Sequence, residues 1–359
     1  GCLKGASLIR GVGHVRVFAA MTAIASATPI LHGLWVNPWV WSSLRFVTGF
    51  CFAILYLVIE SWLNERSTNE NRGSVFSAYV LINMTVLGIG QQMLLLYDPI
   101  HLDLFALASV MVSLAAVPVV LSRAENPRTI EDAKLDFRYL YRNSAVGMLG
   151  SLVCGMANGS FWALGPVFAV DISGDMSLTA NFMTAVVLGS ALGQWPLGWL
   201  SDRTDRRIVL GVVASAGFIV GAVIWLMAPQ LSSIGIITLA ALWGALAFPI
   251  YPLAAAHAND RADVGSFVLV SAGLLLMYGV GAIIGPMIAS MVMTLGSPGY
   301  LFLFTSMVHL LLAIYVVARR FARPEAALSD HKPFSDALAS TQTRSQVFED
   351  ELERAEEPE

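Results

Sequence analysis

Charged residues are scarce in this chain of 359 residues, because only 13% are Asp, Glu, Lys or Arg whereas 56% are hydrophobic. The mean hydropathy is +0.68. A composition this apolar excludes an ordinary soluble protein. The net charge of −4 carries little information, because the charges are segregated along the chain. The sequence predicts an all-α, polytopic membrane protein.

Cysteine is equally scarce. Cys2, Cys51 and Cys154 lie in or beside apolar stretches without metal-ligand spacing, so we expect small core side chains and no disulfide. The chain has no Gly-x-x-x-x-Gly-Lys loop for nucleotide phosphates. It also lacks a Ser/His/Asp or His-rich cluster on one face of an apolar stretch. These absences argue against ATP drive, an enzyme, a metal or cofactor, and a nucleic-acid partner.

What the chain does contain is ten apolar segments, each close to the ~17–25 residues that cross a bilayer. Ten complete transmembrane helices are therefore expected. Their predicted bounds are 15–35, 39–63, 74–97, 100–121, 144–170, 177–200, 208–228, 231–256, 265–294 and 299–318.

Basic residues occupy alternate connections between these segments. Lys and Arg precede the first segment and follow the second, fourth, sixth, eighth and tenth, while the intervening connections contain none. The positive-inside rule places the basic connections in the cytoplasm. We therefore expect a cytoplasmic linker at 122–143, with a short surface helix near Ile130–Tyr141, and an acidic, disordered cytoplasmic tail at 321–359.

A ten-residue turn joins the sixth and seventh segments, and its pattern is Gly-x-x-x-Asp-Arg-x-x-Arg-Arg. This pattern resembles the loop signature of the major facilitator superfamily, except that Asp205 stands where the family usually has Gly. The resemblance implies two six-helix bundles in pseudo-twofold arrangement, moving small solutes by rocker-switch alternating access. The positions that carry the pattern are Gly198, Asp202, Arg203, Arg206 and Arg207.

An internal repeat supports the same interpretation. Tyr56, Asn64, Glu65 and Arg66 recur 195 positions later as Tyr251, Asn259, Asp260 and Arg261. A parallel repeat of six helices makes the ten segments helices three to twelve of such a protein. We expect a first half at 1–121, a second half at 144–320, and helix one with most of helix two upstream of this sequence. The run Glu60–Arg66 resembles the bacterial YcaD-like branch, which implies a bacterial inner membrane.

Arg45 is the one Lys or Arg in the interior of a segment, where an arginine requires a polar cavity or a partner. With Gly49 it forms an Arg-x-x-x-Gly pattern that resembles a fourth-helix motif of the superfamily, which implies substrate binding or proton coupling. Arginine snorkelling is the alternative. Further candidates for substrate or coupling contacts, or for polar links between helices, are Asn83, Gln91, Asn158, Trp162, Gln194 and Tyr251.

The basic turn suggests a gate. We expect Asp202 to accept hydrogen bonds from the amides that open the eleventh helix, near Val264–Ser266. The first-half counterpart keeps Arg10 and Arg16 but has Ile9 in the Asp position. Glu60 is expected to pair with Arg10 or Arg16. In the eleventh helix, close packing or a hinge is predicted at Gly281, Gly285 and Pro286.

Acidic side chains are absent from the segment interiors, and Glu60 and Asp103 lie near segment ends. Proton-coupled transporters generally need an intramembrane titratable group. Either the carrier lies in the upstream helices, or coupling uses no buried carboxylate in this region. The partners expected are a small-molecule solute, the bilayer and, if coupled, protons, for a monomer. A transporter-like sensor or assembly partner without transport activity remains the alternative.

Overall fold

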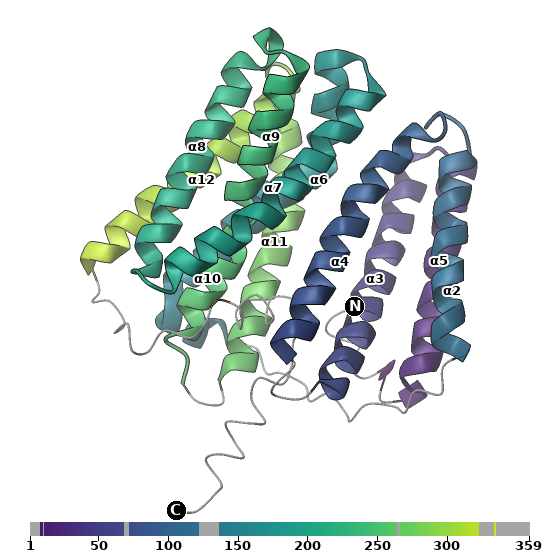
Figure 1. Cartoon of the computed structure of the whole chain (residues 1–359), viewed down its shortest axis with the longest axis horizontal. Helices are drawn as coiled ribbons and strands as arrows, with labels where there is room; N and C mark the ends of the chain where they lie inside the picture. Colours follow the sequence, from purple (N-terminus) through teal and green to yellow (C-terminus); the bar gives the residue numbers. More distant parts are fainter. Residues whose placement is uncertain are drawn as a thin grey trace, which may run out of the picture. The chain divides into compact units, whose positions relative to one another are not determined.

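The computed structural model describes residues 8–9, 11–67, 72–121, 136–263, 266–322 and 334. The described residues form helices and turns without a strand, and ten helical stretches are long and apolar enough to cross a membrane (Figure 1). This confirms the predicted polytopic all-α fold and its ten spans.

The helix bounds follow the predicted segments closely. The α-helices are α2 His14–Leu34, α3 Pro38–Arg66, α4 Arg72–Gln92, α5 Asp103–Leu121, α6 Phe137–Ser173, α7 Met176–Ser201, α8 Arg206–Met227, α9 Ser233–Ala247, α10 Ile250–Asn259, α11 Phe267–Thr294 and α12 Tyr300–Ala322, with short 3-10 turns η1 Met93–Leu95 and η2 Ala228–Gln230.

Two helices depart from the predicted spans. The eighth segment is divided into α9 and α10 next to Pro249, whose ring removes an amide donor and crowds the preceding turn. The fifth is longer than predicted, because α6 begins at Phe137 and bends at Ser144, where φ is −145° and ψ is 86°. The bend separates the short helix at the end of the linker from the membrane span.

The chain divides into two compact units. Unit 1 comprises Gly1–Phe76 and Met93–Asp132, and unit 2 comprises Ser77–Gln92 and Ala133–Glu359. These units differ from the expected halves in α4, most of which groups with unit 2. Within unit 2, the amide of Gln92 in α4 donates to the Thr184 hydroxyl in α7 at 2.7 Å.

In unit 1, α2 packs along α3 and α5. Its core is formed by apolar side chains of α2 and α3, among them Phe18, Cys51 and Ile54. Across the α2–α5 contact, the Ser109 hydroxyl donates to the carbonyl of Ser26 at 2.6 Å. Cys51, like Cys154 in unit 2, is a buried free thiol, as predicted for a core side chain.

In unit 2, α6 packs along α11, α8 along α12, and α7 along α9 (Figure 1). Apart from Arg206, the largest fully buried side chains are aromatic and pack against one another. Trp243 lies 5.1 Å from Phe161 and 5.5 Å from Phe302, between ring centroids. This aromatic core joins α6, α9 and α12.

The prediction of a surface helix near Ile130–Tyr141 is wrong at Leu140, which is buried in protein, whereas Phe137 and Tyr141 are exposed. Leu140 is fully buried and packs against Gly273 of α11. The Tyr139 hydroxyl donates to the Asp263 carboxylate at 2.9 Å. Residues 122–135, which include the first part of the predicted surface helix, lie outside the described residues, and so does the predicted disordered tail apart from Phe321, Ala322 and Phe334.

Candidate gating turn and transport residues

The turn between α7 and α8 is organised by Asp205, which caps the N-terminus of α8. Its Oδ1 accepts the backbone N–H of Arg207 at 2.8 Å, and its Oδ2 pairs with the Arg207 guanidinium at 3.0 Å. Burial raises the pKa of the Asp205 carboxyl, but these hydrogen bonds and the charge of Arg207 outweigh it and hold the pKa below its ordinary 3.8. Asp205 therefore stays ionised near neutral pH.

Arg206 fastens this turn to the end of α10. Its side chain is 1% exposed, and its Nε lies 2.6 Å from the Asp260 Oδ2, whose side chain is 2% exposed. Its Nη1 also lies 3.2 Å from the Asp202 Oδ1 and donates to the Ser201 hydroxyl at 3.0 Å. By binding several acceptors at once, the Arg206 guanidinium holds α7, α8 and α10 together.

Asp202 has a different partner from the one expected. Its two carboxylate oxygens accept the backbone N–H of Phe334 at 2.9 and 3.2 Å. Phe334 is 6% exposed, and its ring covers Gly198 so closely that a Cβ there would collide with it. At the start of α11, Ser266 donates its amide to the Asp263 carbonyl instead. The carboxylate of the turn thus binds a residue of the tail.

Arg203 completes the turn on its outer side. It is exposed, and its guanidinium lies over the Trp199 ring at 4.1 Å from the centroid. This contact holds the Arg203 charge at the end of α7. A cation over an exposed aromatic face contributes only about 0.5–1 kcal/mol.

The first-half counterpart is only partly described. Arg10 lies outside the described residues. Arg16 is exposed and Glu60 is buried, and no ion pair joins these two described residues. Nearby, His14 Nε2 and the Ser61 hydroxyl are 3.3 Å apart. The expected pairing of Glu60 with Arg16 is therefore not formed.

Glycines bring α6 and α11 into backbone contact. A Cβ at Gly281 would collide with the Leu152 carbonyl, and one at Gly285 with the Met156 carbonyl. From the other side, a Cβ at Gly155 would collide with the Tyr278 carbonyl. This contact agrees with the packing interpretation of the Gly281–Pro286 motif. A hinge at Pro286, which lies inside the continuous α11, stays a prediction.

We expect Gly281→Ala to lower the free energy of unfolding by about 1–3 kcal/mol, because the two helices must separate to admit the methyl group. Gly279→Ala, two residues away in the same helix, is the matched control, since nothing lies within 4 Å of its added Cβ. Thermal unfolding of the detergent-purified variants measures both. Equal stability of the two variants would contradict the close contact.

Three of the substrate-contact candidates in unit 2 lie on α6 and α10. Asn158 is buried and donates to the Cys154 sulfur at 3.2 Å. Tyr251 is buried, with its ring 5.1 Å from that of Tyr278. Trp162 is half-buried against Phe248 at 5.9 Å between centroids.

The remaining polar candidates are half-buried: Asn83 and Gln91 in α4, and Gln194 in α7. Gln194 makes a 3.5 Å contact with the Ser190 hydroxyl in its own helix. These three lie on other helices than Asn158 and Trp162, which are both in α6. The neighbouring Gln92, rather than Gln91, makes the interhelical bond to α7.

Arg45 is exposed on α3, and so is Gly49, around which an added Cβ would meet nothing within 4 Å. Gly49 is therefore not a packing glycine within unit 1. Arg45, Gly49, Phe52 and Tyr56 follow one face of α3 at helical spacing, and all are exposed. We call these four residues the α3 polar stripe.

A family model described as Major Facilitator Superfamily matches residues 5–269 and 147–352, so the matched regions overlap and together span both predicted halves. The chain belongs to the major facilitator superfamily. Curated relatives agree: the MFS-type transporter YcaD of Salmonella arizonae and that of Salmonella newport, both uncharacterised, are each 29% identical over 310 residues, covering 84% of this chain and 78% of the relative.

Solved superfamily structures share the fold. The nucleoside transporter NupG is 12% identical with a TM-score of 0.70, covering 88% of this chain and 86% of its own. A bacterial homologue of the human lysosomal transporter Spinster, in an inward-facing and occupied conformation, is 15% identical with a TM-score of 0.64, covering 88% and 83%. These similarities establish the superfamily fold.

The structure explains why Asp205 can stand where the superfamily signature usually has Gly. Its φ is −55°, so the backbone needs no glycine there, and the carboxylate caps α8 as a good N-cap residue does. Sequence reasoning missed three contributors: Asp260 as the partner of Arg206, Phe334 as the partner of Asp202, and His257, which is buried beside the turn. The repeat had marked Asp260 without assigning its partner.

Proposed function

We propose that the protein is a secondary active transporter that moves a small organic solute by alternating access. The observation that carries this proposal is the family match across both halves. Similar proteins are named an MFS-type transporter and a nucleoside transporter, and these names favour transport of a small molecule.

In unit 1 the α3 polar stripe supports the proposal. An arginine about seven residues inside a span costs at least a few kcal/mol in hydrocarbon unless it meets water or a polar partner. Gly49 leaves open space one turn from Arg45, and Tyr56 adds a hydroxyl on the same face. A stripe of this kind suits a water-filled solute path, and we assign it that role.

In unit 2 the cluster of Asn158, Tyr251 and Trp162 combines an amide with aromatic rings. Side chains of this kind suit a polar uncharged or amphipathic solute, through hydrogen bonds and stacking. The span interiors contain no Asp or Glu, which disfavours a strongly cationic solute. Proton coupling would then depend on groups outside these interiors.

We place the protein as a monomer in a bacterial inner membrane. The ends of the unit-2 helices that carry Arg203, Arg206, Arg207, Arg261 and Arg319 form one basic face. The positive-inside rule places this basic face, with the linker and tail, in the cytoplasm. Cysteine accessibility labelling at Ser297 and Ser335 tests the placement, with opposite sidedness expected.

A ligand screen on the detergent-purified protein tests the proposed function, because a ligand that prefers the native state raises the apparent melting temperature. Nucleosides, sugars, organic acids, amino acids and lipophilic drugs are compared in parallel. Stabilisation by one class is expected, followed by saturable uptake of that class in proteoliposomes with an imposed proton gradient. A folded protein that responds to no class and moves no solute would instead favour the sensor or assembly partner.

A further inference from the structure

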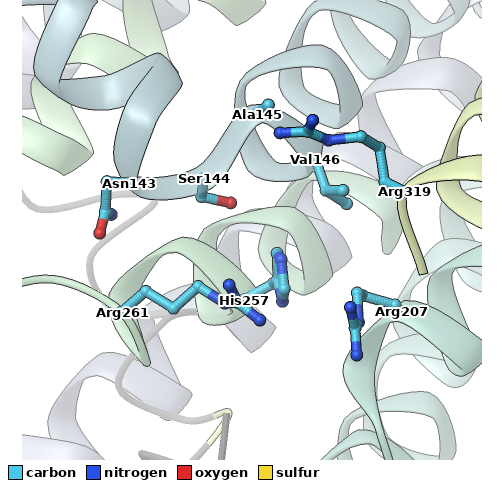
Figure 2. A pocket seen from close by; sticks show the side chains of 8 residues that line it. All are labelled: Asn143, Ser144, Ala145, Val146, Arg207, His257, Arg261 and Arg319. Carbon is cyan, nitrogen blue, oxygen red and sulfur yellow. The ribbon is translucent and has the colours of Figure 1, made fainter. Parts of the chain in front are cut away.

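A small pocket opens on the basic face, apart from the residues assigned to the solute path (Figure 2). It holds about 250 Å³ of empty space, including the part open to solvent. Four elements supply its walls: the bend of α6, the start of α8, the end of α10 and the end of α12. The lining residues are Asn143, Ser144, Ala145, Val146, Arg207, His257, Arg261 and Arg319.

The lining is strongly basic. It includes three arginines and one histidine, and none of the described lining residues is Asp or Glu. Figure 2 shows Arg261 and Arg319 extending toward the pocket from opposite sides, with His257 between Arg261 and Arg207. Arg207 and His257 are buried, at 5% and 7% exposure. An anionic group in the pocket would offset the repulsion among the three arginines.

Two carboxylates near the pocket bind arginines of the turn. Asp205 binds Arg207 at 3.0 Å, and Asp260 binds Arg206 at 2.6 Å. Arg319 reaches the pocket from the last turn of α12, with its guanidinium 6.0 Å from the Tyr315 ring. An oxyanion in the pocket would meet several guanidinium donors at once, which is the arrangement that binds phosphate.

The bend of α6 adds a further element of anion recognition. Ser144 has extended backbone angles, and its hydroxyl accepts the amide of Gly147 at 2.9 Å, as an N-cap residue does. The helix therefore restarts at Ala145, and the first turn of the restarted helix lines the pocket. First-turn amides and the helix dipole favour an anion at that place. The arginines supply a second, independent reason.

We propose that this pocket binds a phosphate monoester or inorganic phosphate. The phosphoryl group would contact Arg261 and Arg319 and the start of the α6 span, and would hold α6, α10 and α12 together on the basic face. Its source is either free phosphate or the headgroup of an anionic phospholipid such as phosphatidic acid. The proposal does not depend on the solute or on transport.

The test uses the full chain, purified in a nonionic detergent without phosphate. The apparent melting temperature is measured against inorganic phosphate at constant ionic strength with chloride, and against micelles containing phosphatidic acid or phosphatidylcholine. Arg319→Gln removes a pocket guanidinium. Arg320→Gln is the matched control, because Arg320 is exposed on the same helix turn and does not line the pocket.

A saturable rise in the melting temperature with phosphate is expected, with the half-saturating concentration about tenfold higher in Arg319→Gln and unchanged in Arg320→Gln. A rise with phosphatidic acid alone, with the same dependence on Arg319, would support the site and identify a lipid headgroup as its source. No rise with either probe, or an equal loss in Arg320→Gln, would overturn the proposal. Arg261→Gln provides a second pocket variant if Arg319→Gln does not fold.

Discussion

Replacing Arg206 with methionine is expected to lower the free energy of unfolding by about 3–5 kcal/mol, because it removes one partner of a buried ion pair. The Asp260 side chain is 2% exposed, and Arg206 Nε is 2.6 Å from its carboxylate. Without the guanidinium, a carboxylate remains in a site with little water. The same change also removes the contacts from Arg206 to Asp202 and Ser201. Thermal and chemical unfolding in detergent measures the loss.

Arg203→Met in the same turn is the control. Arg203 is exposed, so its replacement is expected to change stability by no more than about 0.5–1 kcal/mol. The double variant with Arg206→Met and Asp260→Leu should recover much of the lost stability, since both charges are then absent. An Arg206→Met variant as stable as Arg203→Met would show that the buried pair does not fasten the turn to α10.

The membrane fold was predictable because one physical constraint dominates it. A bilayer sets the length of each helix and excludes charge from its interior, so composition alone located all ten spans to within a few residues. The break before α10 and the bend at Ser144 were not located. Pro249 lies inside an otherwise continuous apolar segment, and proline is tolerated in many transmembrane helices. The Ser144 bend depends on contacts with α10, such as the Asn143 amide donating to the Ala258 carbonyl at 3.0 Å.

The sequence predicted the α7–α8 turn of the candidate site, but not the residues from distant parts of the chain that contact the turn. The motif pointed to the α7–α8 turn, but partners such as Asp260 and Phe334 are 54 and 132 positions away from Arg206 and Asp202. Phe334 stands in a polar stretch of tail that offered no periodic signal. The basic pocket was also missed, because its three arginines lie in α8, just after α10 and in α12, and meet only in the folded chain.

The turn and the pocket share one residue, Arg207, which gives the basic face a specific organisation. Asp205 orients Arg207 at the start of α8, and Arg207 in turn lines the pocket opposite the bend of α6. A change at the turn would therefore also alter the charge that surrounds the pocket. In the proposed alternating-access cycle, phosphate occupancy would influence how readily the basic face rearranges.

Arg45→Ala is expected to abolish transport while leaving the protein folded. In unit 1 the Arg45 side chain is exposed, and no hydrogen bond or ion pair joins it to another described residue. Its loss therefore removes little packing, and surface substitutions of this kind change stability by about 0.5 kcal/mol or less. If the α3 polar stripe lines the solute path, the guanidinium is the one permanent charge there, and its removal eliminates the group that binds solute or responds to the coupling ion.

Uptake or efflux of the solute found in the screen is measured in proteoliposomes, with size-exclusion profiles and melting temperatures as folding controls. Arg45→Lys retains the positive charge but loses the planar set of guanidinium donors. Partial transport by this variant would show that charge suffices. No transport would show that a bidentate contact is required. Arg320→Ala replaces an exposed arginine in the last turn of α12, and this variant should transport like the unmodified protein. Transport at the unmodified rate by Arg45→Ala would leave snorkelling as the role of Arg45, and the solute path would then have to be sought on other helix faces.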